Sequence, residues 1–337
     1  MSLLLNQPPK LCFRKPVLVR SSSSSSSYLP QTLPDAIVCV DPCRPHLVTF
    51  VAKKDGDMTP LEKKAPMEVM ERIGIIGTSN GWLATFQEDR VHLIEHPTPS
   101  FEFDSKSVWL PPVVTLPLCQ TQMVTNMAMS SSSPEEEDFV VALKFLGPQL
   151  SFCRPAAGPY SEWINMRIEN PCFFSSRIMF SKKDGVFRIP GSGGHLIGSW
   201  DLTGKQNQTP QIKRLRFENI PKMTKTKLEI LDSCDTSEHL VESTTTGETF
   251  MIKWYKKTVP KTIKGIERLE TKALMVFKLE EEEGHAVYTQ DIGNLVIFLT
   301  KSETLCVPAS SVPAMRPNHV KILDVDETAV VDLAAQM

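Results

Sequence analysis

Short runs of residues that favour β-strands, separated by turn-forming residues, limit the folds open to this chain. Many runs alternate polar and apolar side chains, as residues 248–255 do, and they recur at intervals of about 8–12 residues. About twenty runs lie between Asp35 and Leu333, too many for one sandwich or small barrel. The sequence therefore predicts an all-β protein. Among these runs 227–231 is expected to be a strand, and only 66–72 and 332–336 are expected to be helical.

A β-propeller accommodates this number of strands, because each blade uses about 40–45 residues and four strands. The chain of 337 residues would then form about six blades. The last runs, 304–307, 320–323 and 329–332, are one strand short of a four-stranded blade. Because an unclosed ring exposes strand edges, we expect residues 36–40 or 47–52 to complete that blade. Alternatively, both runs belong to the first blade and packing alone closes the ring.

The N-terminal segment differs in composition from the rest. Residues 1–34 contain four basic residues, a serine run at 21–27 and no Asp or Glu; the basic residues are Lys10, Arg14, Lys15 and Arg20. A cationic, acid-free leader of this kind is typical of organellar transit peptides, and Pro8 and Pro9 interrupt the apolar stretch that a secretory signal needs. We expect a transit peptide over residues 1–30 and the propeller domain over 31–337. The destination is a mitochondrion or a chloroplast, and the alternative is a disordered tail.

Overall composition excludes several classes of protein. The formal charge is −2, from 37 basic and 39 acidic residues, so nothing points to nucleic acid as a general partner. No apolar run approaches the roughly 18 residues that span a membrane. The eight cysteines form no CxxC pair, and the nearest approach to a metal site is Cys39, Cys43 and His46. A structural zinc site needs a fourth ligand, so we expect core cysteines and no bound metal or cofactor.

Two motifs and a strand are candidate structural landmarks. Asn80 and Gly81 form a strong hairpin signal, because both tolerate positive φ, and Trp82 should then fill the space between sheets. Gly193 and Gly194 lie in a glycine-rich turn without the Lys-Ser/Thr end or the helix of a phosphate loop. A tight crossing between strands is the expected role of this turn. The remaining landmarks are Trp200, Asp201 and Trp254. Trp200 and Asp201 end the predicted strand 195–201, and Trp254 lies in the predicted strand 248–255.

These motifs carry a resemblance to a known family. Residues 74–84, 186–201, 241–257 and 286–310, followed by Arg316-Pro317-Asn318, resemble in order the pattern of the plant domain-of-unknown-function 295 family, the KIB-type β-propellers. The resemblance covers roughly residues 38–333 and implies a Kelch-like propeller that binds a protein partner. Many members carry an N-terminal F-box, for which residues 1–35 are too short and too basic. The resemblance therefore points to an organellar branch and away from a ubiquitin-ligase core as partner.

No catalytic motif is present: the sequence has no Gly-x-Ser-x-Gly elbow, no His-Glu-x-x-His and no Walker loop. The runs of acidic residues at 135–138 and 280–283 are best explained as solvated turns. We therefore expect a non-catalytic organellar module that binds protein. One alternative is an organellar RNA-associated factor that uses the basic segments 213–216 and 253–264. The other is an enzyme of unknown class.

Overall fold

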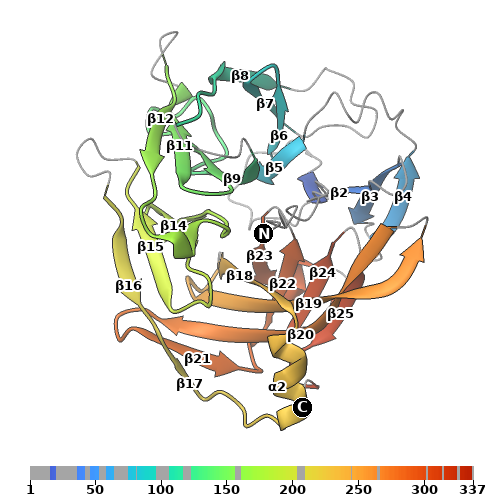
Figure 1. Ribbon diagram of the computed structural model, residues 1–337. Coiled ribbons are helices and arrows are strands. Elements are labelled where there is room, and N and C mark those ends of the chain that lie inside the picture. The colour runs from blue at the N-terminus through green and yellow to red at the C-terminus, as the bar shows by residue number, and fades with distance from the viewer. Residues whose placement is uncertain are drawn as a thin grey trace, which may run out of the picture.

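The computed structural model shows a chain that is almost entirely β. It describes 75–80, 82–95, 106–116, 123–155, 161–202, 209–243, 245–263, 266–300, 303–312, 315–324 and 327–335, and the backbone of strands at 16–19, 36–41, 46–52 and 58–63. This part of the chain forms six sheets arranged around a common centre, each built from the next stretch of sequence (Figure 1). No helix in it is long and apolar enough to cross a membrane.

The first four sheets are antiparallel meanders of four strands each. Sheet 1 contains β1 (Pro16–Val19), β2 (Ala36–Asp41), β3 (His46–Ala52) and β4 (Met58–Lys63). Sheet 2 contains β5 (Ile75–Ser79), β6 (Trp82–Gln87), β7 (Arg90–Glu95) and β8 (Ser107–Pro112). Sheet 3 contains β9 (Val124–Met129), β10 (Val141–Phe145), β11 (Gln149–Cys153) and β12 (Ile164–Arg167). Sheet 4 contains β13 (Met179–Ser181), β14 (Val186–Pro190), β15 (Leu196–Trp200) and β16 (Gln211–Arg214).

The last two sheets depart from the simple meander. Sheet 5 has five strands in the order β17-β21-β20-β19-β18, with β17 parallel to β21. These strands are β17 (Arg216–Glu218), β18 (Asp235–Glu242), β19 (Thr249–Ile263), β20 (Ile266–Glu280) and β21 (His285–Thr289). Sheet 6, in the order β23-β22-β24-β25, contains β22 (Leu295–Thr300), β23 (Leu305–Pro308), β24 (His319–Leu323) and β25 (Thr328–Asp332). Short 3-10 helices lie at Pro171–Phe173 and Ala309–Ser311.

The expected closure of the ring by strand exchange is wrong. Strands β2 and β3 pair within sheet 1, and sheet 6 obtains all four strands from the C-terminal part of the chain. The reason is the path of the chain after β22: β23 turns back along one edge, and β24 then pairs in parallel with the other edge. Sheet 6 therefore has no place for an N-terminal strand. Packing between neighbouring sheets holds the ring together, as in the alternative interpretation.

Two predicted elements have a different secondary structure in the described chain, and strands β8 and β9 were not predicted. Residues 227–231, predicted as a strand, lie in helix α2 (Lys225–Asp232), which Thr224 caps by accepting a hydrogen bond from the Lys227 N–H. Apolar residues at 228, 230 and 231 imitate a strand pattern, but the cap and the surrounding good helix formers favour the helix. The predicted C-terminal helix is instead the end of β25 followed by a turn. The other predicted helix, 66–72, lies outside the described residues.

Separate hydrophobic clusters fill the spaces between neighbouring sheets. Trp82 lies in the cluster between sheets 2 and 3, Trp200 in that between sheets 3 and 4, and Trp254 in that between sheets 5 and 6. All three are at most 2% exposed, as expected. The indole N–H of Trp82 donates to the Ser132 carbonyl at 2.8 Å, and that of Trp254 donates to Thr271 Oγ1 at 2.8 Å. Burying a ring while satisfying its polar atom stabilises each contact.

The glycine-rich turn between β14 and β15 is a close crossing, as expected. Gly194 has φ of +74°, and a Cβ placed there would lie 2.7 Å from Met251 Sδ on sheet 5. Gly193 also has positive φ, at +80°, but its nearest neighbour would be a His195 carbon at 3.7 Å. The first glycine of the pair is therefore needed for its backbone conformation, and the second also for the lack of a side chain.

We predict that Gly194→Ala destabilises the protein more than Gly193→Ala does. Both variants should lose about 1–2 kcal/mol because of the positive φ. Gly194→Ala should lose a further 1–3 kcal/mol, approximately, because the methyl group overpacks the contact with Met251. Urea unfolding of the two variants and the parent measures the difference. Equal losses would contradict the close crossing.

Candidate functional site

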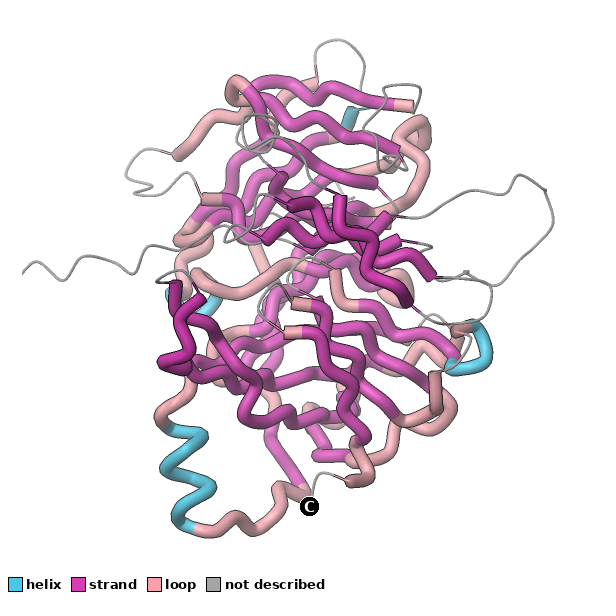
Figure 2. The backbone as a smooth tube through the Cα atoms, turned by 90° about the vertical axis from the view of Figure 1, so that its right-hand side faces the viewer, coloured by secondary structure: helices cyan, strands magenta, loops and turns pink. Residues whose placement is uncertain are grey.

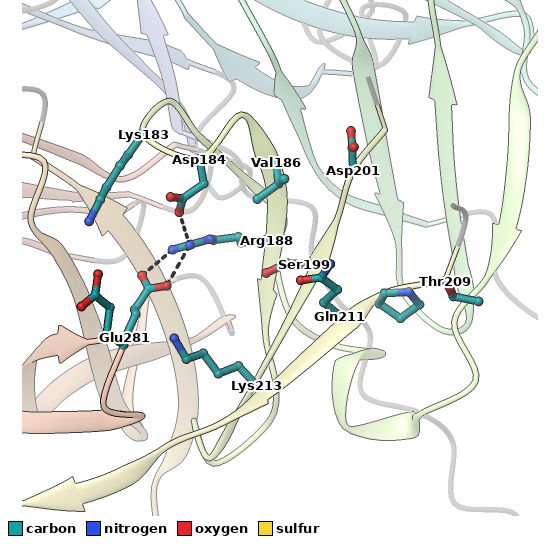
Figure 3. A pocket seen from close by; sticks show the side chains of 12 residues that line it. Lys183, Asp184, Val186, Arg188, Ser199, Asp201, Thr209, Gln211, Lys213 and Glu281 are labelled. Atoms are coloured by element: carbon teal, nitrogen blue, oxygen red, sulfur yellow. Dashed lines mark hydrogen bonds and ion pairs between the residues drawn. The ribbon is translucent and has the colours of Figure 1, made fainter. Parts of the chain in front are cut away.

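A polar cleft lies between sheets 4 and 5 (Figure 3). It has a volume of about 590 Å³ and is lined by residues of β14, β15, β16 and the turn between β20 and β21. The charged lining residues are Lys183, Asp184, Arg188, Asp201, Lys213, Glu281 and Glu282. Ser199, Thr209 and Gln211 add neutral hydrogen-bonding groups. The cleft therefore presents both signs of charge close together.

Arg188 holds the two walls of the cleft together. Its side chain is only 7% exposed, and its guanidinium forms ion pairs with Asp184 of its own sheet and with Glu281 of sheet 5. The Glu281 contact is bidentate, at 2.5 and 2.8 Å. Within the described part of the chain, the buried Nε of Arg188 has no hydrogen-bond partner. Since charge-assisted bidentate pairs are strong and directional, this contact sets the position of the β20–β21 turn.

The acidic run at 280–283 forms this turn. Glu280, Glu282 and Glu283 are exposed, as expected of a solvated turn, whereas Glu281 is bound by Arg188. On its other side lies a second cavity of about 310 Å³, which shares Lys183, Glu281 and Glu282 with the cleft. The turn is therefore a ridge between two polar hollows.

Two lysines point toward the cleft without a described ion pair. Figure 3 shows Lys183 on one side of Arg188 and Lys213 below it, both with extended side chains. Among the described residues no carboxylate lies within 4.0 Å of either ammonium group. These ammonium groups can donate to carbonyl or carboxylate oxygens of a partner without first breaking an internal ion pair.

Oxygen and nitrogen ligands for a metal gather at one place in the described residues. Glu280, Glu283 and His285 each bring a ligand atom within 4.8 Å of the others. His285 Nδ1 also lies 3.4 Å from a Glu218 oxygen and 3.9 Å from a Glu283 oxygen, so these two carboxylates are explained as partners of the histidine, and Glu280 is exposed. The side chains of Cys39, Cys43 and His46 lie outside the described residues. No metal or cofactor is assigned here.

The sequence landmarks are dispersed and do not form one site. Asn80 adopts φ of +49° in its turn, and its backbone N–H donates to the Glu303 carboxylate, which joins sheets 2 and 6. Gly81 lies outside the described residues. The tryptophans belong to different clusters, and Asp201 alone lines the cleft. Sequence reasoning missed Arg188 and Lys183, because only the fold brings residues 183–188 beside residue 281, and it considered Lys213 only as part of the basic segment 213–216.

Other charged groups are buried away from the cleft. His239 on β18 is 4% exposed, and its pKa lies well below the usual value because of burial and then the positive charges of Arg177 and Lys256. Burial also lowers the pKa of Arg177 to about 10, an effect that Asp324 opposes. Lys256 Nζ lies 3.7 Å from Asp324 and 4.0 Å from the centroid of the Trp254 ring. His239 is therefore neutral in the folded protein.

We predict that His239 makes the stability pH-dependent. The unfolded chain takes up a proton on this histidine near pH 6.5, whereas the folded chain does not. The free energy of unfolding is therefore highest above pH 6.5 and falls as the pH drops below this value. Between pH 8 and pH 5.5 the loss should be about 1.4 kcal/mol. The measurement is urea unfolding of the parent and of His239→Gln at both pH values. Burial also lowers the pKa of His92, but that contribution is common to both proteins. Parallel pH profiles of the two proteins would therefore contradict the prediction.

We predict that Arg188→Met weakens the contact between sheets 4 and 5. The substitution leaves the partly buried carboxylates of Asp184 and Glu281 without their cation, which should cost about 1–3 kcal/mol. A matched control is Lys225→Met, whose ion pair with Glu229 is on the surface and should contribute about 0.3–0.5 kcal/mol. Hydrogen exchange should also rise at 281–284 in Arg188→Met alone. Equal stability of the two variants would show that Arg188 does not hold the turn.

Six sheets packed side by side around a centre, most of them antiparallel meanders of four strands, define a β-propeller. Its family follows from the sequence as a whole, because a family model described as the KIB1-4 β-propeller matches residues 50–332. The chain therefore belongs to the KIB1-4 β-propeller family, which confirms the family resemblance. A search of curated proteins found no match.

The solved structures that this chain matches have little sequence in common with it. Kluyveromyces lactis Hsv2 is 9% identical, with a TM-score of 0.33 over 74% of this chain and 84% of that one. The complex of KlAtg21 with the coiled-coil of AgAtg16 gives 10% identity and a TM-score of 0.37, over 81% and 87% of the chains. BBS1N, solved in complex with ARL6DN, is 10% identical, with a TM-score of 0.31 over 89% of this chain and 98% of that one.

Proposed function

We propose that this protein is a non-catalytic β-propeller of an organelle that binds other proteins and acts as a scaffold. The observation that carries the proposal is the cleft between sheets 4 and 5, with cations and carboxylates on a frame held by Arg188. Alternating charges of both signs select a partner with the complementary arrangement. Loops held on a rigid sheet scaffold are a usual place for such binding.

The basic segments offer less support for RNA binding. Lys213 lines a cleft that also contains four carboxylates. Lys253 Nζ lies 4.0 Å over the ring of Phe217, and Lys256 is 8% exposed. RNA binding needs a continuous positive face with aromatic side chains free to stack on bases. In the described part of these segments, Lys253, Lys256 and Lys257 make contacts within the protein.

We propose no catalytic role for the perturbed ionisable groups. Burial raises the pKa of Glu238, but its carboxylate accepts a hydrogen bond from the Gly193 N–H at 3.0 Å. Burial lowers the pKa of Lys253, which pairs across the sheet with Glu238 and covers Phe217. These groups, like His239, lie within the packing between sheets. Their contacts explain them as parts of the fold.

Site-specific cross-linking in isolated organelles tests the proposed function. A photoreactive residue replaces Gln211 in the cleft or, as control, exposed Thr328 on β25. We expect protein adducts from position 211 that are absent at position 328. The double variant Lys183→Glu/Lys213→Glu should lose these adducts while its melting temperature stays the same as that of the parent. A ubiquitin-ligase core is not expected among them. Adducts of RNA alone, or the same adducts at both positions, would overturn the proposal.

The organellar location gives a separate prediction. A fluorescent protein fused to residues 1–30 should enter mitochondria, with chloroplasts as the alternative, because the segment is cationic and free of acids. A fusion with Lys10, Arg14, Lys15 and Arg20 changed to Gln should remain in the cytosol. Nuclear or secreted fluorescence would contradict the prediction.

Cleavage during import has a structural consequence. Strand β1, at Pro16–Val19, pairs with β2, so cleavage near residue 30 would remove one strand of sheet 1. N-terminal sequencing of the imported protein measures which strands the mature form keeps.

A further inference from the structure

In the described part of the chain, the outer edge of sheet 4 carries backbone groups that no other strand pairs with. Strands make up much of this part (Figure 2), so most of its backbone N–H and C=O groups are bonded within a sheet. β16 is the last strand of sheet 4 and lies at the rim of the ring (Figure 1). Two of its residues, Gln211 and Lys213, line the cleft. An unpaired strand edge therefore lies beside the candidate site.

The pairing of β16 with β15 determines which of its backbone groups point outward. In an antiparallel pair, residue pairs that exchange hydrogen bonds alternate with pairs whose N–H and C=O groups point away from each other. The Leu215 N–H donates to the His195 carbonyl at 2.8 Å, and Ile212 pairs with Gly198 three steps along the same register. The N–H and C=O of Ile212 therefore point away from β15. Among the described residues neither group has a hydrogen-bond partner.

The side chains of β16 divide between its two faces. Successive side chains of a strand alternate, so Ile212 projects on the face opposite to the one from which Gln211 and Lys213 reach the cleft. The Ile212 side chain is 51% exposed. A strand added to this edge would therefore meet an aliphatic side chain on one face and an ammonium group on the other.

The residues on either side of Ile212 limit the length of strand that can be added. Pro210 points to the same edge and offers a C=O but no N–H. At the other end, the Arg214 carbonyl lies 3.3 Å from the position that a Cβ of Gly284 would take, and the Gly284 carbonyl accepts the Arg216 N–H. The turn between β20 and β21 therefore limits the edge beyond Arg214. The available edge is short and centred on Ile212.

Other outer strands do not combine these features. β8 ends in two prolines, and β17 has only three residues. β25 offers Val330, which is 54% exposed and pairs with Lys321 three steps from the bond between the Leu333 N–H and the Asn318 carbonyl. The N–H of Val330 therefore also points outward, but neither described cavity borders β25. β25 is thus a matched control, an edge of the same kind without the cleft.

We propose that the edge of β16 binds an extended segment of the partner by antiparallel strand addition, with an apolar residue opposite Ile212 and an acidic residue opposite Lys213. In this binding mode backbone hydrogen bonds supply affinity and alternate side chains supply specificity. Asp184 and Glu281 are bound by Arg188, which leaves Lys213 available to a carboxylate of the partner. This inference rests on the proposed function and names the conformation and charge of the segment that binds.

A second copy of the chain fits this edge less well. Pairing of two β16 edges about a two-fold axis would place Ile212 against Ile212. It would also gather Lys213 and Arg214 of both copies in one short ladder. Like charges this close together are destabilising, so a separate partner with an acidic segment is favoured.

The probes are labelled peptides titrated with the full chain by fluorescence anisotropy. One peptide alternates valine with glutamate and the other alternates valine with lysine. We expect the valine–glutamate peptide to bind about tenfold more tightly, because its carboxylates lie opposite Lys213.

Two N-methylated forms of the valine–glutamate peptide separate strand addition from other binding modes. Methyl groups on the valine nitrogens remove the donors that would bond the Ile212 carbonyl, whereas methyl groups on the glutamate nitrogens lie on the far edge of the added strand. Both forms keep the same side chains. We expect the first form to bind about tenfold more weakly than the unmethylated peptide and the second to bind as it does.

Variants of the protein test the same contacts from the other side. Ile212→Pro removes the outward N–H without removing a donor to β15, and it should weaken binding of the valine–glutamate peptide about tenfold. The matched control Val330→Pro removes the corresponding N–H of β25 and should leave binding unchanged. Lys213→Glu should make the valine–lysine peptide the tighter ligand.

Equal binding of the two N-methylated peptides, equal binding of the acidic and basic peptides, or no binding of either would overturn the inference. These measurements use the unchanged chain, so a folding defect in a variant does not affect them. A dimer without peptide that Ile212→Pro dissociates would also overturn it, because a second copy would then occupy the edge. Protein adducts from position 211 in organelles, together with equal binding of the N-methylated peptides, would refute strand addition while supporting the proposed function.

Discussion

The structure depends on the burial of sheet faces against neighbouring sheets. A twisted sheet of four strands has two faces, and exposing an apolar face to water costs about 25 cal/mol per Å². The protein meets this constraint with clusters that each take side chains from two adjacent sheets, and Trp82, Trp200 and Trp254 occupy three different clusters. Because each sheet needs its neighbours, the ring must form as a whole. Interactions that adjust the spacing of two sheets therefore also adjust any site between them.

Polar contacts between sheets add direction to this packing. Arg188 binds Glu281 across the cleft, Glu238 receives the Gly193 N–H, and Glu303 receives the Asn80 N–H. Each carboxylate lies on a turn or strand that belongs to a different sheet from its partner. Hydrophobic contact alone would allow the sheets to slide, whereas these bonds have preferred directions. The cleft thus has a defined shape.

Much of the fold could be predicted from residue patterns, and little of the candidate site. Alternation and turn residues identified most strands after residue 73, and the glycine pair at 193 and 194 was correctly interpreted as a close crossing. The helix at 225–232 was missed, because its apolar spacing imitates a strand and its cap is a single threonine. Lys144 was also missed as a core residue, although its ammonium is buried and donates to the Gly147 and Phe174 carbonyls. Nothing local distinguishes such a lysine from a solvated one.

The sequence by itself determined that the chain is all-β, that it has enough strands for about six blades, and that Trp82, Trp200 and Trp254 belong between sheets. These properties follow from local periodicity and from the side chains that each turn or strand accepts. Only the tertiary structure decided how sheet 6 completes itself without an N-terminal strand, and which charges meet in the cleft. The physical reason is that strand order and long-range ion pairs depend on where the chain returns in space. Arg188 and Glu281 are 93 positions apart, and no pattern within either segment specifies the other.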